Sequence, residues 1–176
     1  LALLADRAEH GDRVGLLAFD AKVQSFIAPH GGINTMQKLT QASAAIEYSP
    51  LETNYTLALS ELGARLRRRS VVIVLTDFTD TISAELMIEN LTRLARKHLV
   101  LFAAIRDPAV AKTVNTEPLT SLDINKSIVA NQLLLERKRV LQELNRAGVL
   151  CVDGTPEQMS IDLINKYLDV HRRELV

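Results

Sequence analysis

Two uninterrupted apolar segments constrain the fold of this chain more than any other feature. Residues 71–75 read Val-Val-Ile-Val-Leu, and residues 99–105 read Leu-Val-Leu-Phe-Ala-Ala-Ile. A strand with one face in water alternates apolar and polar side chains, whereas a strand covered on both faces is apolar throughout. Because helices cover both faces of parallel sheets, these segments predict an α/β fold with the two strands in its interior.

Three further stretches, rich in apolar and β-branched side chains, complete the expected strands; they are residues 13–19, 22–27 and 149–152. Only Asp20 and Ala21 separate the first two, so we expect an antiparallel hairpin whose second strand lies at a sheet edge and ends at Pro29. Helical segments separate the other strands, which implies parallel pairing through right-handed crossovers. The sequence therefore predicts a doubly wound α/β domain, with a mostly parallel sheet, helices on both faces and one antiparallel edge strand.

Apolar side chains at helical spacing predict the helices between the strands. Two sets at i, i+4, i+7 and i+11 each form one stripe against the sheet; they are Tyr55, Leu59, Leu62 and Leu66, and Ala84, Ile88, Leu91 and Ala95. Further helices are expected over residues 1–10, 125–147 and 160–173. Thr35 and Ser83 occupy positions typical of helix N-caps, and Gly148 follows the long helix as a C-terminal glycine should. Residues 106–123 contain two Pro and many polar side chains and predict a long surface connection.

Composition excludes several classes of function. Lys plus Arg and Asp plus Glu number 21 each, so the chain lacks the basic surface of a nucleic-acid binder or of a protein held on anionic lipid. No apolar run approaches the length of a membrane span. The single cysteine, Cys151, excludes an internal disulfide and a Cys-rich zinc site, and within a short apolar strand we interpret it as unreactive. The histidines lack zinc-motif spacing, and His98, beside Arg96 and Lys97, lies in a helix C-terminal turn, where positive charge suits the helix dipole.

Oxygen-bearing side chains collect in two loops. Residues 76–80 read Thr-Asp-Phe-Thr-Asp and follow a strand, at the edge where open α/β sheets bind ligands. Asp77 and Asp80 suit a hard cation such as Mg²⁺, but they are equally suited to cap the loop and the next helix. The second loop contains Thr53 and Asn54 ahead of a helix, and either side chain is suited to cap that helix.

Taken together, the two loops resemble those of the von Willebrand factor A domain. In that fold a Thr from one loop and an Asp after the strand supply two of the three ligand groups of the metal-ion-dependent adhesion site, which implies Thr53 and Asp77 as metal ligands here. More narrowly, five segments resemble the bacterial family called domain of unknown function 58; they are residues 11–20, 67–70, 96–100, 106–108 and 165–168. This resemblance covers nearly the whole chain and implies a single von Willebrand factor A-like domain over residues 1–176.

The von Willebrand factor A fold begins with a central strand that ends in Asp-x-Ser-x-Ser, and the chain starts at Leu1 with an expected helix instead. We therefore interpret it as a fragment of a longer protein that lacks this strand. The strands at 13–19 and 71–76 would then either close up or accept a strand from another chain, by strand addition or by swapping into a homodimer. Because the main ligand motif is missing, the site of Thr53 and Asp77 is incomplete, so we expect no cofactor in this fragment and Mg²⁺ in the longer protein.

We expect a non-enzymatic protein-interaction module without catalytic residues. The family resemblance implies a MoxR-type AAA+ ATPase as partner, joint work in assembling or remodelling other complexes, and a cytoplasmic domain whose longer parent is tethered to the membrane by upstream helices. It also implies docking through the face of Thr53 and Asp77, with a metal that bridges to a partner carboxylate. The alternative is a Mg²⁺-dependent phosphoryl-transfer or hydrolytic enzyme that uses Asp77 and Asp80, for which the sequence offers no nucleophile, general base or phosphate loop.

Overall fold

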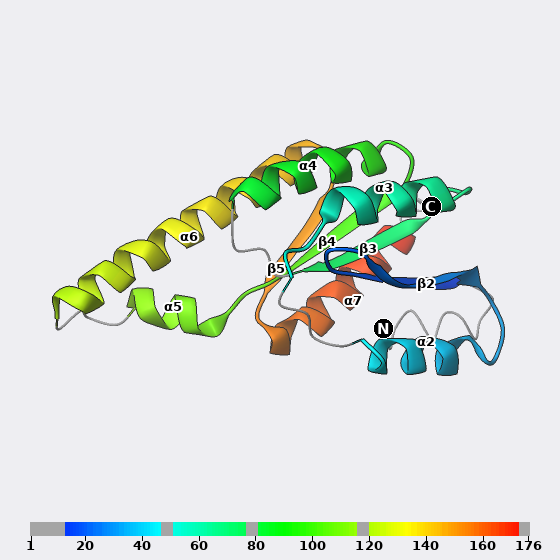
Figure 1. Cartoon of the computed structure of the whole chain (residues 1–176), viewed down its shortest axis with the longest axis horizontal. Helices are drawn as coiled ribbons and strands as arrows, with labels where there is room; N and C mark the ends of the chain where they lie inside the picture. The colour runs from blue at the N-terminus through cyan, green and yellow to red at the C-terminus, as the bar shows by residue number, and fades with distance from the viewer. Residues whose placement is uncertain (1–12, 47–50, 77–80, 116–119, 173–176) are drawn as a thin grey trace. The chain divides into compact units, whose positions relative to one another are not determined.

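The structure, a computed structural model, describes residues 13–46, 51–76, 81–115 and 120–172. The chain divides into two compact units, Leu1–Arg67 and Arg68–Val176, which are described one at a time. Figure 1 shows the helices and strands of both units with their labels. The helix expected over residues 1–10 lies outside the described residues.

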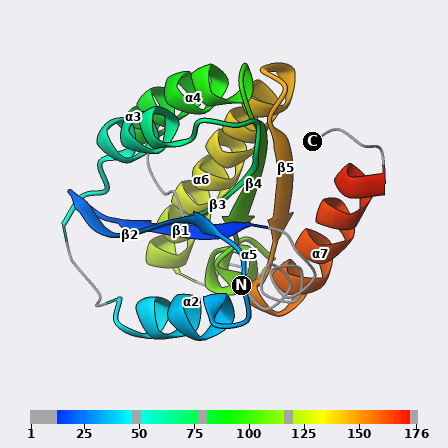
Figure 2. The same ribbon diagram turned by 90° about the vertical axis from the view of Figure 1, so that its right-hand side faces the viewer.

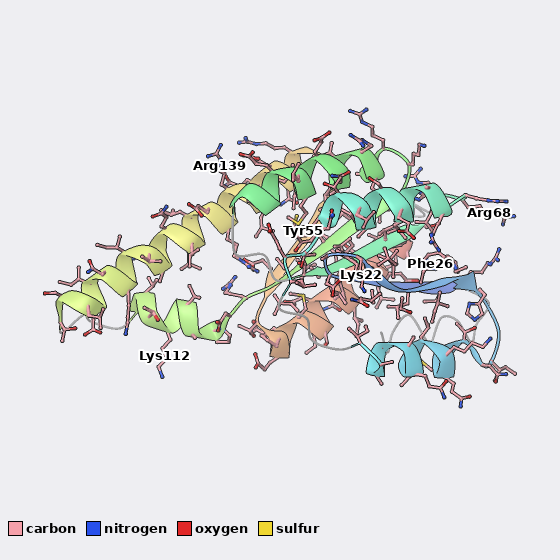
Figure 3. The ribbon with its side chains drawn as sticks, viewed as in Figure 1. Lys22, Phe26, Tyr55, Arg68, Lys112 and Arg139 are labelled. Carbon is pink, nitrogen blue, oxygen red and sulfur yellow. The ribbon has the colours of Figure 1, made fainter. Side chains whose placement is uncertain are left out.

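The first unit contains an antiparallel hairpin and two helices. Strands β1 (Val14–Phe19) and β2 (Val23–His30) pair antiparallel as predicted, with three residues between them, and helices α2 (Thr35–Ala44) and α3 (Tyr55–Arg65) follow. The Phe19 ring meets the Tyr55 ring edge to face at 5.9 Å between centroids. The guanidinium of Arg65 lies 4.2 Å above the ring centroid of Phe26, and Figure 3 labels Phe26 on β2 and Tyr55 on α3. These aromatic contacts fix α3 against the hairpin.

The end of β2 differs from the prediction, because the strand continues through Pro29 to His30. Val14 is opposite His30 and Leu16 is opposite Ile27, so β2 has one extra residue here and forms a bulge. Proline is tolerated at bulges and edge strands, where its missing N–H breaks no ladder hydrogen bond. Gly15 allows the close approach, since a Cβ on it would lie 2.6 Å from the Ile27 carbonyl oxygen.

The second unit is built on a three-stranded parallel sheet in the order β3-β4-β5, made of β3 (Val71–Thr76), β4 (Leu99–Ile105) and β5 (Leu150–Gly154). The helices are α4 (Thr81–Ala95), α5 (Pro108–Asn115), α6 (Ser121–Arg146) and α7 (Pro156–Arg172). Figure 2 shows α4 and α6 on one side of the sheet and α7 on the other. The central strand β4 is covered on both faces, with Leu101 and Phe102 fully buried. The parallel α/β core predicted from the two apolar segments is therefore confirmed.

The expected single sheet is present as two separate sheets. Among the described residues β1 pairs with β2 only, and β3 pairs with β4 only. Whether the strands at 13–19 and 71–76 close up or accept a strand from another chain stays a prediction. The α/β fold class is correct, whereas the antiparallel edge strand belongs to the hairpin and not to the parallel sheet.

Several helix ends differ from the prediction. Thr35 is the first residue of α2 and is 1% exposed, and the N-cap position belongs to Asn34. Ser83 lies inside α4, which begins at Thr81. Neither is the N-cap predicted, because a Ser or Thr that precedes an apolar stripe also fits the first turn of a helix. Gly148 closes α6 with φ +85°, as predicted.

The expected surface connection over residues 106–123 contains helix α5 and the first turn of α6. Asp107 starts α5 by accepting a hydrogen bond from the Ala109 N–H at 2.8 Å, with Pro108 at the first helical position. Thr120 and Asp123 form a capping box at the start of α6. Their polar side chains, which look like loop composition, are thus helix-start signals.

Candidate functional site

The predicted metal ligand Thr53 lies directly before α3 and is half-buried. Its neighbour Asn54 is the N-cap, because its Oδ1 accepts a hydrogen bond from the Leu57 N–H at 2.9 Å. The Asn54 N–H donates to the Asp20 carbonyl at 2.8 Å, which fixes this loop to the hairpin turn. The cap assigned to Thr53 or Asn54 is therefore made by Asn54, and Thr53 does not serve as the cap.

Asp77 and Asp80, the other candidate residues, lie outside the described residues. The pairing of Thr53 with Asp77, and the enzymatic alternative with Asp77 and Asp80, stay predictions. Among the residues that the structure describes, no group of three or more His, Cys, Asp or Glu side chains is arranged to hold a metal ion.

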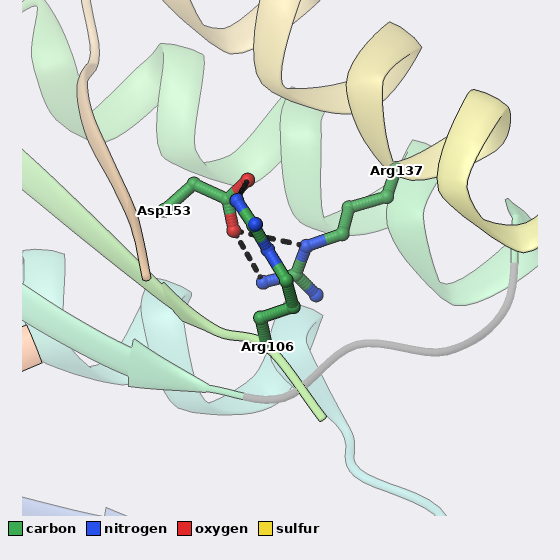
Figure 4. Close-up of polar contacts among 3 residues, drawn as sticks. All are labelled: Arg106, Arg137 and Asp153. Carbon is green, nitrogen blue, oxygen red and sulfur yellow. Dashed lines mark hydrogen bonds and ion pairs between the residues drawn. The ribbon is translucent and has the colours of Figure 1, made fainter. Parts of the chain in front are cut away.

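Polar side chains do meet at the carboxyl edge of the parallel sheet, where β4 and β5 end. Asp153 of β5 accepts hydrogen bonds from two guanidinium groups, as Figure 4 shows. Arg106, which follows β4, donates to Oδ2 at 2.8 Å. Arg137, from the middle of α6, donates to Oδ1 through Nε at 3.1 Å and through a terminal nitrogen at 3.0 Å. The cluster joins β4, β5 and α6 at this edge.

The chemistry of this cluster is that of an anchor. Both carboxylate oxygens of Asp153 accept hydrogen bonds from arginine, so neither is placed to act as a general base. The Arg137 side chain is only 11% exposed, which makes its pairing with Asp153 important for the fold. Position after a strand would have identified Arg106 and Asp153 from the sequence. Arg137 lies in the middle of a long helix and gave no such signal.

The cysteine is unreactive, as interpreted from the sequence. Burial raises the pKa of the Cys151 thiol to about 11, and the nearby Lys166 offsets only part of this effect. The thiol points toward the Leu141 carbonyl oxygen, 3.8 Å away. At neutral pH the group is a protonated thiol, which is a poor nucleophile.

His98 is buried, and this burial disfavours the positive charge that would suit a helix end. It is 4% exposed, and neither ring nitrogen has a hydrogen-bond partner among the described residues. Burial, followed by the charge of Lys97, lowers its pKa from the ordinary value of 6.5. A helix end favours a histidine cation only where water still reaches the ring.

An exposed apolar stripe runs along the N-terminal half of α6. Ile124, Ile128 and Leu135 are 48%, 59% and 69% exposed and lie at i, i+4 and i+11, on the side of α6 opposite the buried Ala130 and Val140. We call these three residues the outer stripe. Figure 1 shows this half of α6 extending beyond the end of the sheet with α5 beside it. Surface helices normally carry polar side chains on this side, so the outer stripe is the most unusual feature of the described surface.

Beyond the outer stripe the same side of α6 becomes polar. Arg139 is 80% exposed and pairs with Glu143 at 3.1 Å, and Figure 3 shows it pointing away from the sheet. None of the described helices combines the length and the apolar character that crossing a membrane requires. The outer stripe is a local patch on an otherwise polar helix.

Comparison with known proteins gives one match. The sequence model of the family described as "Protein of unknown function DUF58" matches residues 1–125. Neither the curated proteins nor the solved structures contain a match to the chain.

Proposed function

We propose that this chain, which belongs to the DUF58 family of proteins of unknown function, is a non-enzymatic protein-interaction module with a von Willebrand factor A-like fold. The observation that carries the proposal is the outer stripe on α6. Contiguous apolar side chains on a water-facing surface mark interaction sites in soluble proteins. Leu122 and Val129, 62% and 57% exposed, are further exposed apolar residues in the same half of α6.

The free energy available from this surface is large enough for specific binding. Burying a Leu or Ile side chain completely is worth about 1.5–3 kcal/mol, and each residue of the outer stripe has roughly half of its surface left to bury. Ile124 and Leu135 together then contribute about 2 kcal/mol, which is about 30-fold in a dissociation constant. Arg139, just beyond the patch, supplies a polar group at its rim.

The partner we propose is a MoxR-type AAA+ ATPase, with which the module assembles or remodels other complexes. This rests on the family resemblance of the sequence, as does a second contact through Thr53 and Asp77 in which Mg²⁺ bridges to a partner carboxylate. Thr53 and its neighbour Asn54 belong to a loop fixed by main-chain hydrogen bonding, which suits a docking surface. The outer stripe and the Thr53 loop belong to different units of the chain.

The proposal is tested by the affinity of the whole chain for a purified MoxR-type ATPase from the same genome, measured by biolayer interferometry. We expect the double variant Ile124→Gln and Leu135→Gln to weaken binding about 30-fold. The matched control is Leu86→Gln with Ile161→Gln, two equally exposed apolar residues on α4 and α7, 53% and 63% exposed, which should leave the affinity unchanged.

Two further results separate the parts of the proposal. The metal contact is tested by measuring the affinity of the unmodified chain and of Asp77→Ala, each with Mg²⁺ and with a chelator. If an ion bridges the two proteins, the substitution and the chelator should weaken binding equally. No binding of the ATPase by the unmodified chain would refute the proposed partner. Equal loss in the outer-stripe variant and in its control would refute the role of α6.

A further inference from the structure

The outer edge of β5 presents main-chain hydrogen-bonding groups. Among the described residues β5 has β4 as its only neighbouring strand. The Arg106 N–H donates to the Gly154 carbonyl at 2.8 Å, so the main-chain groups of Gly154 face β4. Because successive residues of a strand direct these groups to opposite sides, the N–H and C=O of Cys151 and Asp153 point away from β4.

A groove of about 540 Å³ runs between this edge and helix α7. Three consecutive strand residues line it, namely Cys151, Val152 and Asp153. Consecutive side chains of a strand lie on opposite faces, so only the edge itself brings all three to one groove. The Cys151 and Asp153 side chains turn toward α6, where they meet Leu141 and Arg137, whereas Val152 packs with Met159 of α7. The main chain of β5 is thus one wall of the groove.

The opposite wall is the exposed side of α7, and its charges are ordered along β5. The α7 residues that line the groove are Asp162, Asn165, Lys166, Leu168, Asp169 and Arg172. Near the end of the strand, a Cβ on Gly154 would lie 3.5 Å from the Asp162 carboxylate. Near the start of the strand, Lys166 is close enough to act electrostatically on Cys151. The groove therefore has the Asp162 carboxylate at its Gly154 end, and Lys166, Arg172 and the Asp169 carboxylate toward its other end.

We propose that this groove binds an extended segment of a partner protein, which adds to β5 as an antiparallel strand and places a basic side chain near Asp162 and an acidic one near Lys166. A strand edge beside a helix is an arrangement suited to β-strand addition, in which main-chain hydrogen bonds give affinity and the helix wall selects side chains. This site is distinct from the outer stripe and from the Thr53 loop, so it adds a further docking surface to the proposed interaction module.

Geometry favours such a segment over a second copy of the chain. If two copies of the chain paired through their β5 edges about a two-fold axis, the α7 helix of the second copy would enter the groove beside β5. One side of that groove is already formed by α7 of the first copy. A single extended segment has no helix attached beside it, so it can lie along the β5 edge without this conflict. It also satisfies the ordered charges of Asp162 and Lys166 with one residue each.

The test uses fluorescein-labelled peptides and fluorescence anisotropy with the whole chain. The probe, Thr-Lys-Thr-Val-Thr-Glu-Thr, places Lys opposite Gly154 and Glu opposite Leu150 when it pairs antiparallel to β5. We expect saturable binding, and weaker binding of the reversed sequence, Thr-Glu-Thr-Val-Thr-Lys-Thr. N-methylation of the Thr opposite Cys151 removes a main-chain donor aimed at β5 and should weaken binding about tenfold. N-methylation of the central Val should leave the affinity unchanged, because the N–H of this residue points away from β5.

A charge reversal tests the helix wall. We expect Lys166→Glu to weaken binding of the probe about fivefold and to be rescued by a probe with Lys in place of Glu. The exposed control Lys126→Glu, near the N-terminal end of α6 and not among the groove residues, should have no effect. Circular dichroism of each variant checks that it is folded. Absence of saturable binding, or equal loss from the two N-methylated probes, would overturn the proposal. So would a dimer by size exclusion that Lys166→Glu dissociates, because a second copy would then occupy the groove.

Discussion

Removal of the Asp153 carboxylate should destabilise the second unit strongly. Asp153→Ala removes the carboxylate oxygen that accepts two hydrogen bonds from the Arg137 guanidinium, and the Arg137 side chain is only 11% exposed. Removing one member of a buried ion pair costs about 3–5 kcal/mol. Since the Asp153 side chain is itself 28% exposed, we expect the lower end, about 3 kcal/mol. The Arg106 pair, 39% exposed on the arginine side, adds only about 0.5 kcal/mol.

The free energy of unfolding is measured by urea titration with far-ultraviolet circular dichroism. Arg106→Ala is the control, with an expected loss of about 0.5 kcal/mol. Arg137→Met should recover part of the loss in the Asp153→Ala background, because it removes a buried charge that Asp153 no longer neutralises. A loss below about 1 kcal/mol for Asp153→Ala would refute the reasoning that this pair is effectively buried.

Three further predictions concern stability. Burial lowers the pKa of His98 below 6.5, so the unfolded chain takes up the proton at a higher pH than the folded chain, and stability should fall as the pH drops below 6.5. His98→Leu should flatten the dependence of the melting temperature on pH between about pH 5 and pH 8, and an unchanged dependence would contradict this prediction. Gly15→Ala should cost about 1–3 kcal/mol in urea unfolding, since its Cβ would lie 2.6 Å from the Ile27 carbonyl oxygen, and an unchanged midpoint would show that the bulge can move. Thr120→Ala should cost about 1 kcal/mol by loss of the capping box, with Thr120→Ser close to the original chain; equal stability of both variants would count against the cap.

The strands were predictable where burial left a pattern in the sequence. β3 and β4 are covered on both faces and are apolar throughout, so their class and bounds followed from residues 71–76 and 99–105. The hairpin followed from the two-residue spacing after Phe19. Pro29 did not end β2 as predicted, because a bulge accommodates it. That bulge depends on Gly15 in the other strand, and the pattern around Pro29 does not show this contact.

The helix-start signals were harder to interpret, because the same polar residues favour loops. Asp107 with Pro108 and Thr120 with Asp123 are standard helix caps, yet in a segment rich in polar residues the same side chains also fit a surface connection. The charge state of His98 could not be predicted from the sequence, for a different reason. Burial depends on the tertiary fold, which a position beside Lys97 does not reveal.

The sequence identified candidate residues by their place after strands, and this rule has a clear limit. It points to Asp153 and to Arg106 at the carboxyl edge of the sheet, but not to Arg137, which reaches them from α6. The outer stripe was missed as well, because Ile124, Ile128 and Leu135 have the helical spacing of a core face. Only the structure shows that they lie opposite the buried side of α6.

Hydrogen–deuterium exchange of the complex tests most directly whether the module binds its partner through α6. The whole chain is compared alone and with a saturating amount of the MoxR-type ATPase. Binding through the outer stripe predicts slower exchange over residues 122–135, with no change over residues 84–95 of α4, which carries the exposed control residue Leu86. Unchanged exchange over residues 122–135 in a fully formed complex would contradict the proposed interaction surface.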